Sequence, residues 1–263
     1  MAYRDLFKSA GYYYARYRNH YPEELFVRLS EIYCLDATGR LLDLGCGTGQ
    51  LILPLASYFQ EVVGLDTEPE MLAESKRIAA EKGISNIMWV QGRAEDIGPH
   101  MGAFRLATIG HAFHWMDRYA VLSALYEIIQ PGGGVAIMDG CVPPDANTSS
   151  DFRPVMKEVV RRYLGDKRRA GNGFYIPPEE SYDVTIARTP FRIDQREDIF
   201  FQRRWTVDDV VGNCFSKSSS TPLILGDKKE AFERDLRAEL FKSNPSGEWT
   251  ITQGVQAIIL FRD

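Results

Sequence analysis

Short apolar runs and longer amphipathic segments alternate through the first half of the chain. The runs have the length and the polar boundaries of buried strands, whereas the longer segments repeat apolar residues with helical spacing. Five strands are expected at 40–44, 61–65, 87–91, 104–110 and 135–138, with helices at 49–59, 69–82 and 117–130. Strands that alternate with helices form βαβ units, so the pattern predicts a doubly wound, mostly parallel α/β sheet.

The pattern changes on both sides of this core. Residues 1–21 are rich in tyrosine and arginine and precede a helix over 22–34, while a polar connection over 139–150 follows the fifth strand. The later elements are expected as a helix at 151–165, an irregular stretch at 166–190, a strand at 191–204, a capped helix at 205–211, a helix at 228–242 and a strand or hairpin at 249–261. Two late strands would complete a seven-stranded sheet with an antiparallel edge. We therefore expect three parts, 1–39, 40–140 and 141–263.

The loop after the first strand has the composition of a ligand-binding turn. Asp43 stands near the end of the strand, and Gly45, Gly47 and Gly49 follow at alternate positions. Glycine permits positive φ and lets a ligand approach where a Cβ would collide. The helix beyond offers free N–H groups and the positive end of its dipole. The loop alone is also compatible with an ordinary strand–helix turn.

The second strand also ends in an acid, Asp66. In βαβ nucleotide folds an acid about 20 residues beyond the glycines binds the ribose hydroxyls. The residues that follow, Thr67 to Glu70, resemble a capping box with an early proline. We expect Thr67 to cap the next helix, which leaves the Asp66 carboxylate free for a ligand.

Composition limits the class of protein. The chain has 263 residues, of which 44% are hydrophobic and 25% charged, and its net charge is −5, so we do not expect a nucleic-acid partner. The four cysteines lie far apart without a CxxC pair, so no metal site is expected. Neither a signal peptide nor an apolar run long enough to span a bilayer is apparent, so we expect a cytoplasmic protein without membrane contact.

The segment DLGCGTG over 43–49 resembles motif I of the class I S-adenosylmethionine-dependent methyltransferases. In that family the loop passes under the amino acid end of the cofactor, and the acid or a nearby carbonyl receives its ammonium group. The segment GRAEDI over 92–97 resembles the family's adenine-binding turn. The cofactor residues that the resemblance implies in the core are Asp43, Gly45, Cys46, Gly47, Gly49, Asp66, Thr67, Met71, Ala94, Glu95 and His111.

Two further segments resemble the type 11 group of these methyltransferases. YARYRNHYP over 14–22 is similar to an arm that covers the cofactor in that group, which implies roles in cofactor binding for Tyr17 and Arg18. HAFHWMD over 111–117 is similar to the segment that follows the fourth strand. The type 11 group includes enzymes that methylate small carboxylates and natural products, so the resemblance implies a small-molecule acceptor.

His111 and His114 are the candidate catalytic residues. Methyl transfer from a sulfonium depends mainly on holding the nucleophile in line, and a general base is needed only where the acceptor keeps its proton. Histidine titrates near neutrality, and both residues follow a strand at the expected ligand-binding edge. His111 could instead only contact the sulfonium end of the cofactor, and His114 could only orient Trp115 and Asp117.

The sequence thus predicts a methyltransferase that uses S-adenosylmethionine, yields S-adenosylhomocysteine, and methylates an O, N or C atom of a small molecule. A monomer or a homodimer is expected. An NAD(P)-dependent oxidoreductase is one alternative, although the early third glycine opposes it. A non-catalytic module that binds S-adenosylmethionine is another.

Overall fold

The computed structural model describes residues 5–143 and 151–263, so parts of the tyrosine-rich arm (1–4) and of the polar connection (144–150) lie outside the described residues. Contacts divide the chain into two compact units. The sheet unit comprises His20–Cys141, Pro177–Ile199 and Gly254–Asp263, and the helical unit comprises Met1–Asn19, Val142–Ile176 and Phe200–Gln253. Each unit combines segments that are far apart in the sequence, whereas the division expected from the sequence ran consecutively. The boundaries at 39/40 and 140/141 stay a prediction.

Seven strands form one sheet in the order β3-β2-β1-β4-β5-β9-β8. They are β1 (Arg40–Leu44), β2 (Glu61–Asp66), β3 (Ile87–Gln91), β4 (Phe104–Gly110), β5 (Ile129–Cys141), β8 (Arg192–Thr206) and β9 (Glu248–Phe261). The first five pair in parallel, and β9 pairs antiparallel with β5. The predicted doubly wound sheet and its antiparallel addition are confirmed, and the segment expected as a strand or hairpin at 249–261 is one long strand.

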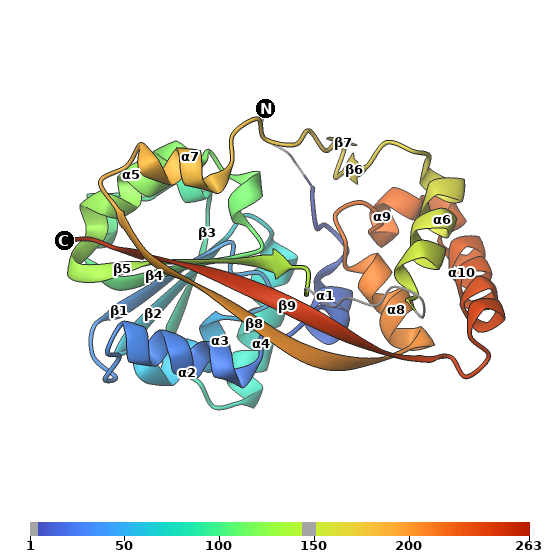
Figure 1. The fold of residues 1–263 in the computed structure, drawn as a ribbon, viewed down its shortest axis with the longest axis horizontal. Helices are drawn as coiled ribbons and strands as arrows, with labels where there is room; N and C mark the ends of the chain where they lie inside the picture. The colour runs from blue at the N-terminus through green and yellow to red at the C-terminus, as the bar shows by residue number, and fades with distance from the viewer. Residues whose placement is uncertain (1–4, 144–150) are drawn as a thin grey trace. The chain divides into compact units, whose positions relative to one another are not determined.

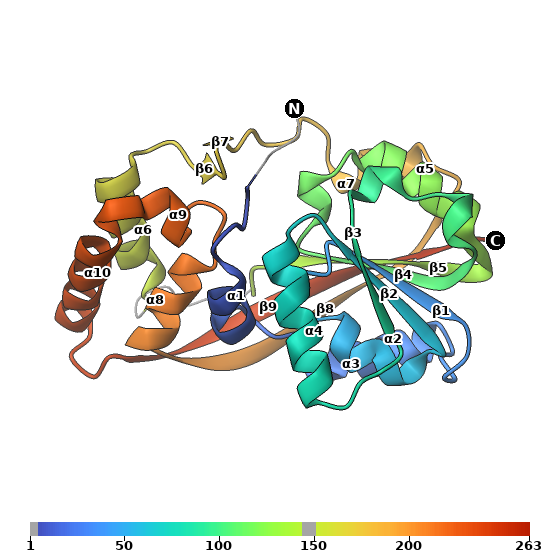
Figure 2. The ribbon, with the colours of Figure 1, turned by 180° about the vertical axis from the view of Figure 1, so that it is seen from behind.

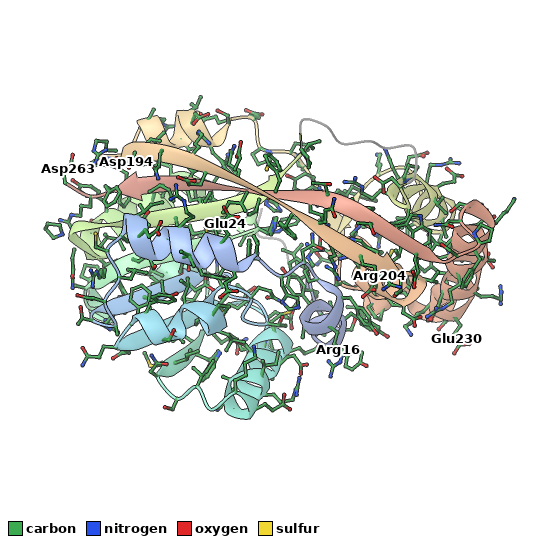
Figure 3. The ribbon with its side chains drawn as sticks, turned by 60° about the horizontal axis from the view of Figure 1, so that its bottom comes forward. Arg16, Glu24, Asp194, Arg204, Glu230 and Asp263 are labelled. Atoms are coloured by element: carbon green, nitrogen blue, oxygen red, sulfur yellow. The ribbon has the colours of Figure 1, made fainter. Side chains whose placement is uncertain are left out.

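Helices cover both faces of the sheet unit (Figures 1 and 2). One face carries α2 (Glu23–Ile32), α3 (Ile52–Leu55) with the 3-10 turn η1 (Ala56–Tyr58), and α4 (Pro69–Glu81); the other carries α5 (Arg118–Ile128) and α7 (Tyr182–Ala187). Each face has its own hydrophobic cluster. On α2 the side chains of Leu25 and Leu29 are buried, whereas Glu24, labelled in Figure 3, is exposed. This alternation is the amphipathic pattern that predicted the helix.

Two expected elements differ in the structure. The helix expected at 49–59 begins only at Ile52, because Gly49 has a φ of +96°, which an α-helix does not accommodate. The stretch expected to be irregular at 166–190 contains α7 and a small hairpin of β6 (Arg169–Ala170) and β7 (Gly173–Phe174). The hydroxyl of Ser181 caps α7 by accepting from the Val184 N–H at 3.4 Å. The cap makes a short helix possible where periodicity gave little signal.

The helical unit has a separate hydrophobic core. Its helices are α1 (Gly11–Tyr17), α6 (Arg153–Leu164), α8 (Val207–Phe215), α9 (Pro222–Leu225) and α10 (Lys229–Ser243), with the turn η5 (Gly226–Lys228). Trp205, Phe215 and Phe232 are its largest fully buried side chains. The capped helix expected after residue 205 is confirmed: Thr206 and Asp209 form a reciprocal capping box at the start of α8. Among the described residues, no helix has the length and apolar character needed to cross a membrane.

Candidate active site

The glycine loop lies at the carboxyl ends of the parallel strands of the sheet unit, where open α/β sheets bind ligands. Gly45, Gly47 and Gly49 all have positive φ, at +67°, +53° and +96°. A Cβ at Gly45 would lie 2.6 Å from the Cβ of Ala112, in the segment after β4. Both the backbone conformation and this close approach therefore require glycine at position 45.

Asp43 is a buried acid at the end of β1. Its side chain is 1% exposed, and the Thr108 hydroxyl of β4 donates to its Oδ1 at 2.7 Å. Burial, opposed by this hydrogen bond and reinforced by the charge of Asp66, raises the pKa of Asp43 to about 7. A carboxyl in this state gains from a nearby cation, because a cation stabilises the ionised form. Asp43 therefore fits the predicted approach of an ammonium group.

Asp66 holds the glycine loop to the start of α4. Its Oδ2 accepts from the Gly47 N–H at 2.9 Å and its Oδ1 accepts from the Glu68 N–H at 2.8 Å. The expectation that Thr67 caps α4 is wrong: the N-cap residue is Glu68, it has no side-chain cap, and Thr67 is exposed. Asp66 is therefore not free, because it already accepts from the two N–H groups. Each carboxylate oxygen keeps a second lone pair, so its predicted role in ribose binding stays compatible with these contacts.

The remaining cofactor candidates of the core differ in what they offer. The side chains of Cys46, Met71 and Ala94 are buried, and burial raises the pKa of the Cys46 thiol well above its ordinary value. Glu95 accepts from the Asp117 N–H at 2.9 Å and pairs with Arg93 at 3.2 Å. Cys46 and Met71 can therefore contact a cofactor only through apolar surface and backbone groups. Glu95 links the turn after β3 to the start of α5.

A hydrogen-bonded cluster surrounds Asp139 at the end of β5. His111 Nδ1 lies 2.9 Å from Asp139 Oδ1, and the Tyr182 hydroxyl donates to Asp139 Oδ2 at 3.1 Å. Gly140 N–H donates to Oδ1 at 2.9 Å. Although burial by itself raises the pKa of Asp139, the hydrogen bond and charge of His111 outweigh it and lower that pKa to about 2. Asp139 is therefore ionised at neutral pH and is the acceptor of this contact, so His111 Nδ1 carries the proton; in the neutral imidazole Nε2 is then the acceptor nitrogen.

His111 also has an unusual backbone. Its φ is +51°, in the left-handed region that non-glycine residues seldom adopt, and its N–H donates to the Met138 carbonyl at 2.8 Å. The Tyr21 ring stacks on its imidazole with centroids 5.8 Å apart. Such a conformation costs about 1–3 kcal/mol and persists where surrounding contacts fix it, often at functional sites.

His114 stands in the short helix η4 (Phe113–Trp115) that follows. Its Nδ1 lies 3.9 Å from Asp139 Oδ2, farther than that of His111, and its ring is 4.7 Å from the Trp115 ring. The two histidines predicted as bases are thus brought together on one carboxylate. The described residues contain no cluster of metal-ligating side chains of the kind that holds an ion.

Sequence reasoning missed two members of this cluster. Asp139 carried a signal, because it directly follows the apolar run 135–138, as Asp66 follows the strand expected at 61–65. Tyr182 carried none, because it lies in the stretch expected to be irregular and reaches Asp139 only through the packing of α7, where its ring meets Phe113 edge-on at 5.0 Å.

Tyr17 and Arg18, the two cofactor residues expected from the arm, belong to the helical unit. The Tyr17 ring lies against Gly212 of α8, where a Cβ would be 2.2 Å from it, and its carbonyl accepts from Asn213 Nδ2 at 3.2 Å. Their part in cofactor binding stays a prediction.

Comparison with known proteins agrees with this site. The sequence profile of a methyltransferase domain family matches residues 41–133. A demethylmenaquinone methyltransferase from Thermus thermophilus is 32% identical over 151 residues, which are 56% of this chain and 68% of that protein. A Dictyostelium discoideum protein named as a methyltransferase is 22% identical over 239 residues, or 91% of this chain and 86% of that protein.

The uncharacterized methyltransferase YcgJ of Bacillus subtilis is similar in sequence and in fold. The sequence match is 29% identical over 139 residues, or 52% of this chain and about half (51%) of YcgJ. The crystal structure of YcgJ matches 91% of this chain and 97% of its own, with a TM-score of 0.54 and 19% identity, which shows a shared fold. The chain belongs to the class I S-adenosylmethionine-dependent methyltransferases. Family membership decides against the alternative of an NAD(P)-dependent oxidoreductase.

Proposed function

We propose that the chain binds S-adenosylmethionine at the sheet unit and methylates an O, N or C atom of a small molecule, with His111 as the base where the acceptor must lose a proton. The observation that carries this proposal is the contact between the two parts of the site. The glycine loop packs on Ala112, and the adjacent residue, His111, is hydrogen-bonded to an ionised Asp139. Cofactor loop and candidate base are thus fixed to each other.

The residues present fit the cofactor. Glycines 45, 47 and 49 hold the loop in a positive-φ conformation that other residues seldom adopt, and the buried Asp43 gains from an ammonium. When bound, S-adenosylmethionine supplies a methyl group on a sulfonium, which makes transfer a one-step displacement. The part of this chain is to orient the acceptor and, through Nε2 of His111, to take its proton.

The acceptor class rests on composition and on the relatives. The net charge of −5 argues against a broad basic surface for nucleic acid. The Thermus thermophilus relative is named for a small acceptor, demethylmenaquinone. A small molecule is therefore the acceptor that we propose here, without a choice among O, N and C atoms.

Calorimetric titration with S-adenosylmethionine and S-adenosylhomocysteine, with NADH as control, tests the cofactor. Micromolar binding of the adenosyl ligands with no NADH signal is expected. A folded protein that binds neither would overturn the proposal.

Transfer of a labelled methyl group to a fractionated metabolite extract tests catalysis and the acceptor class. Label is expected in small molecules, and where the acceptor must lose a proton it should be absent with His111→Asn, since asparagine tolerates positive φ but is no base. Cofactor binding without transfer to any fraction would instead indicate the non-catalytic module.

A further inference from the structure

The helical unit contains cations that pair with no acid among the described residues. We call Arg18, Arg168, Arg169 and Lys217 the basic cluster. Arg18 directly follows α1, and Lys217 lies in the serine-rich turn after α8. Arg168 and Arg169 stand at the start of the β6–β7 hairpin. These four residues come from three segments that are far apart in the sequence but belong to one compact unit.

Hydrogen bonds tie the three segments together. Asn213 Nδ2, near the end of α8, donates to the carbonyl of Tyr17, the residue before Arg18, at 3.2 Å. Gly171 N–H, in the hairpin turn, donates to the carbonyl of Ser218, the residue after Lys217, at 3.2 Å. The chain positions next to the cations are therefore fixed against one another by the fold.

The side chain of Lys217 is partly buried. Its ammonium lies 3.3 Å from the Met156 sulfur of α6, a weak acceptor. Burial, together with the positive charges of Arg18, Arg153 and Arg168, lowers the pKa of Lys217 to about 8. The ammonium thus stands among like charges in a desolvated place, which destabilises the fold unless a negative group compensates.

That negative group does not come from the described part of the chain. Within it, none of the four cations has a carboxylate at ion-pair distance, whereas the neighbouring Arg153 pairs with Asp151. Arg169 Nε is buried and has no hydrogen-bond partner among the described atoms. A buried donor without an acceptor is uncommon in native proteins and calls for an explanation, such as a ligand.

We propose that the basic cluster binds a small anion through its carboxylate or phosphate groups. Guanidinium groups match the geometry of both oxyanions, and an ammonium adds a point charge. The ligand is small because Arg169 Nε is buried and Lys217 is partly buried, so a broad polymer surface does not reach them. This inference does not depend on methyl transfer by the sheet unit.

Titration of the whole chain with citrate, succinate and inorganic phosphate, at ionic strength matched with sodium chloride, tests the proposal. At least one probe is expected to bind with Kd below about 1 mM. Citrate or succinate alone would identify carboxylate as the group, and phosphate alone would identify phosphate. No binding by any of the three would overturn the proposal.

The variant Lys217→Met should weaken binding of that probe at least about tenfold, since one charge-assisted contact is lost. Lys228→Met, at an exposed lysine of the same unit, is the matched control and should leave the affinity unchanged. Removal of a partly buried charge that lies among like charges should not prevent folding, and the melting temperatures of both variants check this. Equal affinities in the two variants would contradict the assignment.

A pH series separates this site from general attraction of anions. Lys217 faces Arg18, Arg153 and Arg168, which stay charged, and the Cys214 thiol. Affinity should therefore fall as the pH rises above about 8, and this fall should vanish in Lys217→Met. The same fall in both proteins would overturn the role of Lys217.

Discussion

The charges of the sheet unit and of the basic cluster are treated in opposite ways. At the carboxyl edge of the sheet, each of the acids Asp43, Asp66 and Asp139 accepts at least one hydrogen bond from a protein donor. In the basic cluster, Lys217 meets only a sulfur, and Arg169 Nε meets no acceptor among the described atoms. The hydrogen-bonded acids fix the geometry of the site at the sheet. The cations without an acceptor indicate that the helical unit binds a negatively charged ligand.

The largest effect that we expect comes from Asp43, the most enclosed of the three acids. Its pKa is about 7 in the fold and near 3.8 when unfolded, so the protonated form is favoured by folding. Its contribution to stability is complete below pH 3.8 and is lost as the pH rises through 7. Relative to Asp43→Asn, the free energy of unfolding of the natural chain should fall by roughly 2–4 kcal/mol between pH 4 and pH 8.

Urea unfolding of both proteins across this pH range measures the difference. Asparagine keeps an acceptor for the Thr108 hydroxyl, so the packing is preserved. The exposed Asp227→Asn is the control and should follow the natural chain at every pH. Parallel curves for Asp43→Asn and the natural chain would show that Asp43 is ionised throughout.

Whether a residue of these sites could be predicted from the sequence depends on how local its contacts are. Asp43 stands just before the glycine loop and Asp66 ends the next apolar strand, so a local pattern was enough to place them. Tyr182 and Lys217 reach their positions through packing of segments far apart in the chain, and no local spacing records that. The capping of α4 was predicted wrongly because Thr67 looks like a cap locally, whereas Asp66 binds the Glu68 N–H and Gly47 across the loop.

Gly45 offers the next largest effect, because two separate requirements coincide there. Gly45→Ala introduces both positive-φ strain and a Cβ 2.6 Å from that of Ala112. Gly132→Ala introduces only the strain, since Gly132 has a φ of +77° and open space around it. We expect a loss of about 1 kcal/mol of unfolding free energy for Gly132→Ala and about 2–3 kcal/mol for Gly45→Ala.

Thermal unfolding and cofactor titration should separate these two variants. Only Gly45→Ala should also weaken S-adenosylhomocysteine binding, by tenfold or more, because the loop must shift to relieve the contact. Equal losses in the two variants would mean that the approach of Ala112 is not restrictive.

Asp66→Ala should have a smaller effect, of about 1–3 kcal/mol on unfolding, since two backbone N–H groups lose their acceptor. Its ribose role is tested separately by comparing adenosine with 2′,3′-dideoxyadenosine. The natural chain should prefer adenosine, and Asp66→Ala should lose most of that preference. An unchanged preference would show that Asp66 only holds the glycine loop and does not bind the ribose.

The smallest effect is expected at Tyr182, which gives the third hydrogen bond to a carboxylate that keeps two others. Tyr182→Phe removes only the hydroxyl, and the ring keeps its contact with Phe113. The loss should be about 0.5–1.5 kcal/mol, because Asp139 still accepts from His111 and Gly140. In thermal unfolding this corresponds to a decrease of roughly 1–6 °C for a chain of this size. Methyl transfer should fall less than about tenfold, since His111 stays oriented. A fall of a hundredfold with stability intact would instead place the Tyr182 hydroxyl on the acceptor, and Asp139 would then orient two reacting groups rather than one.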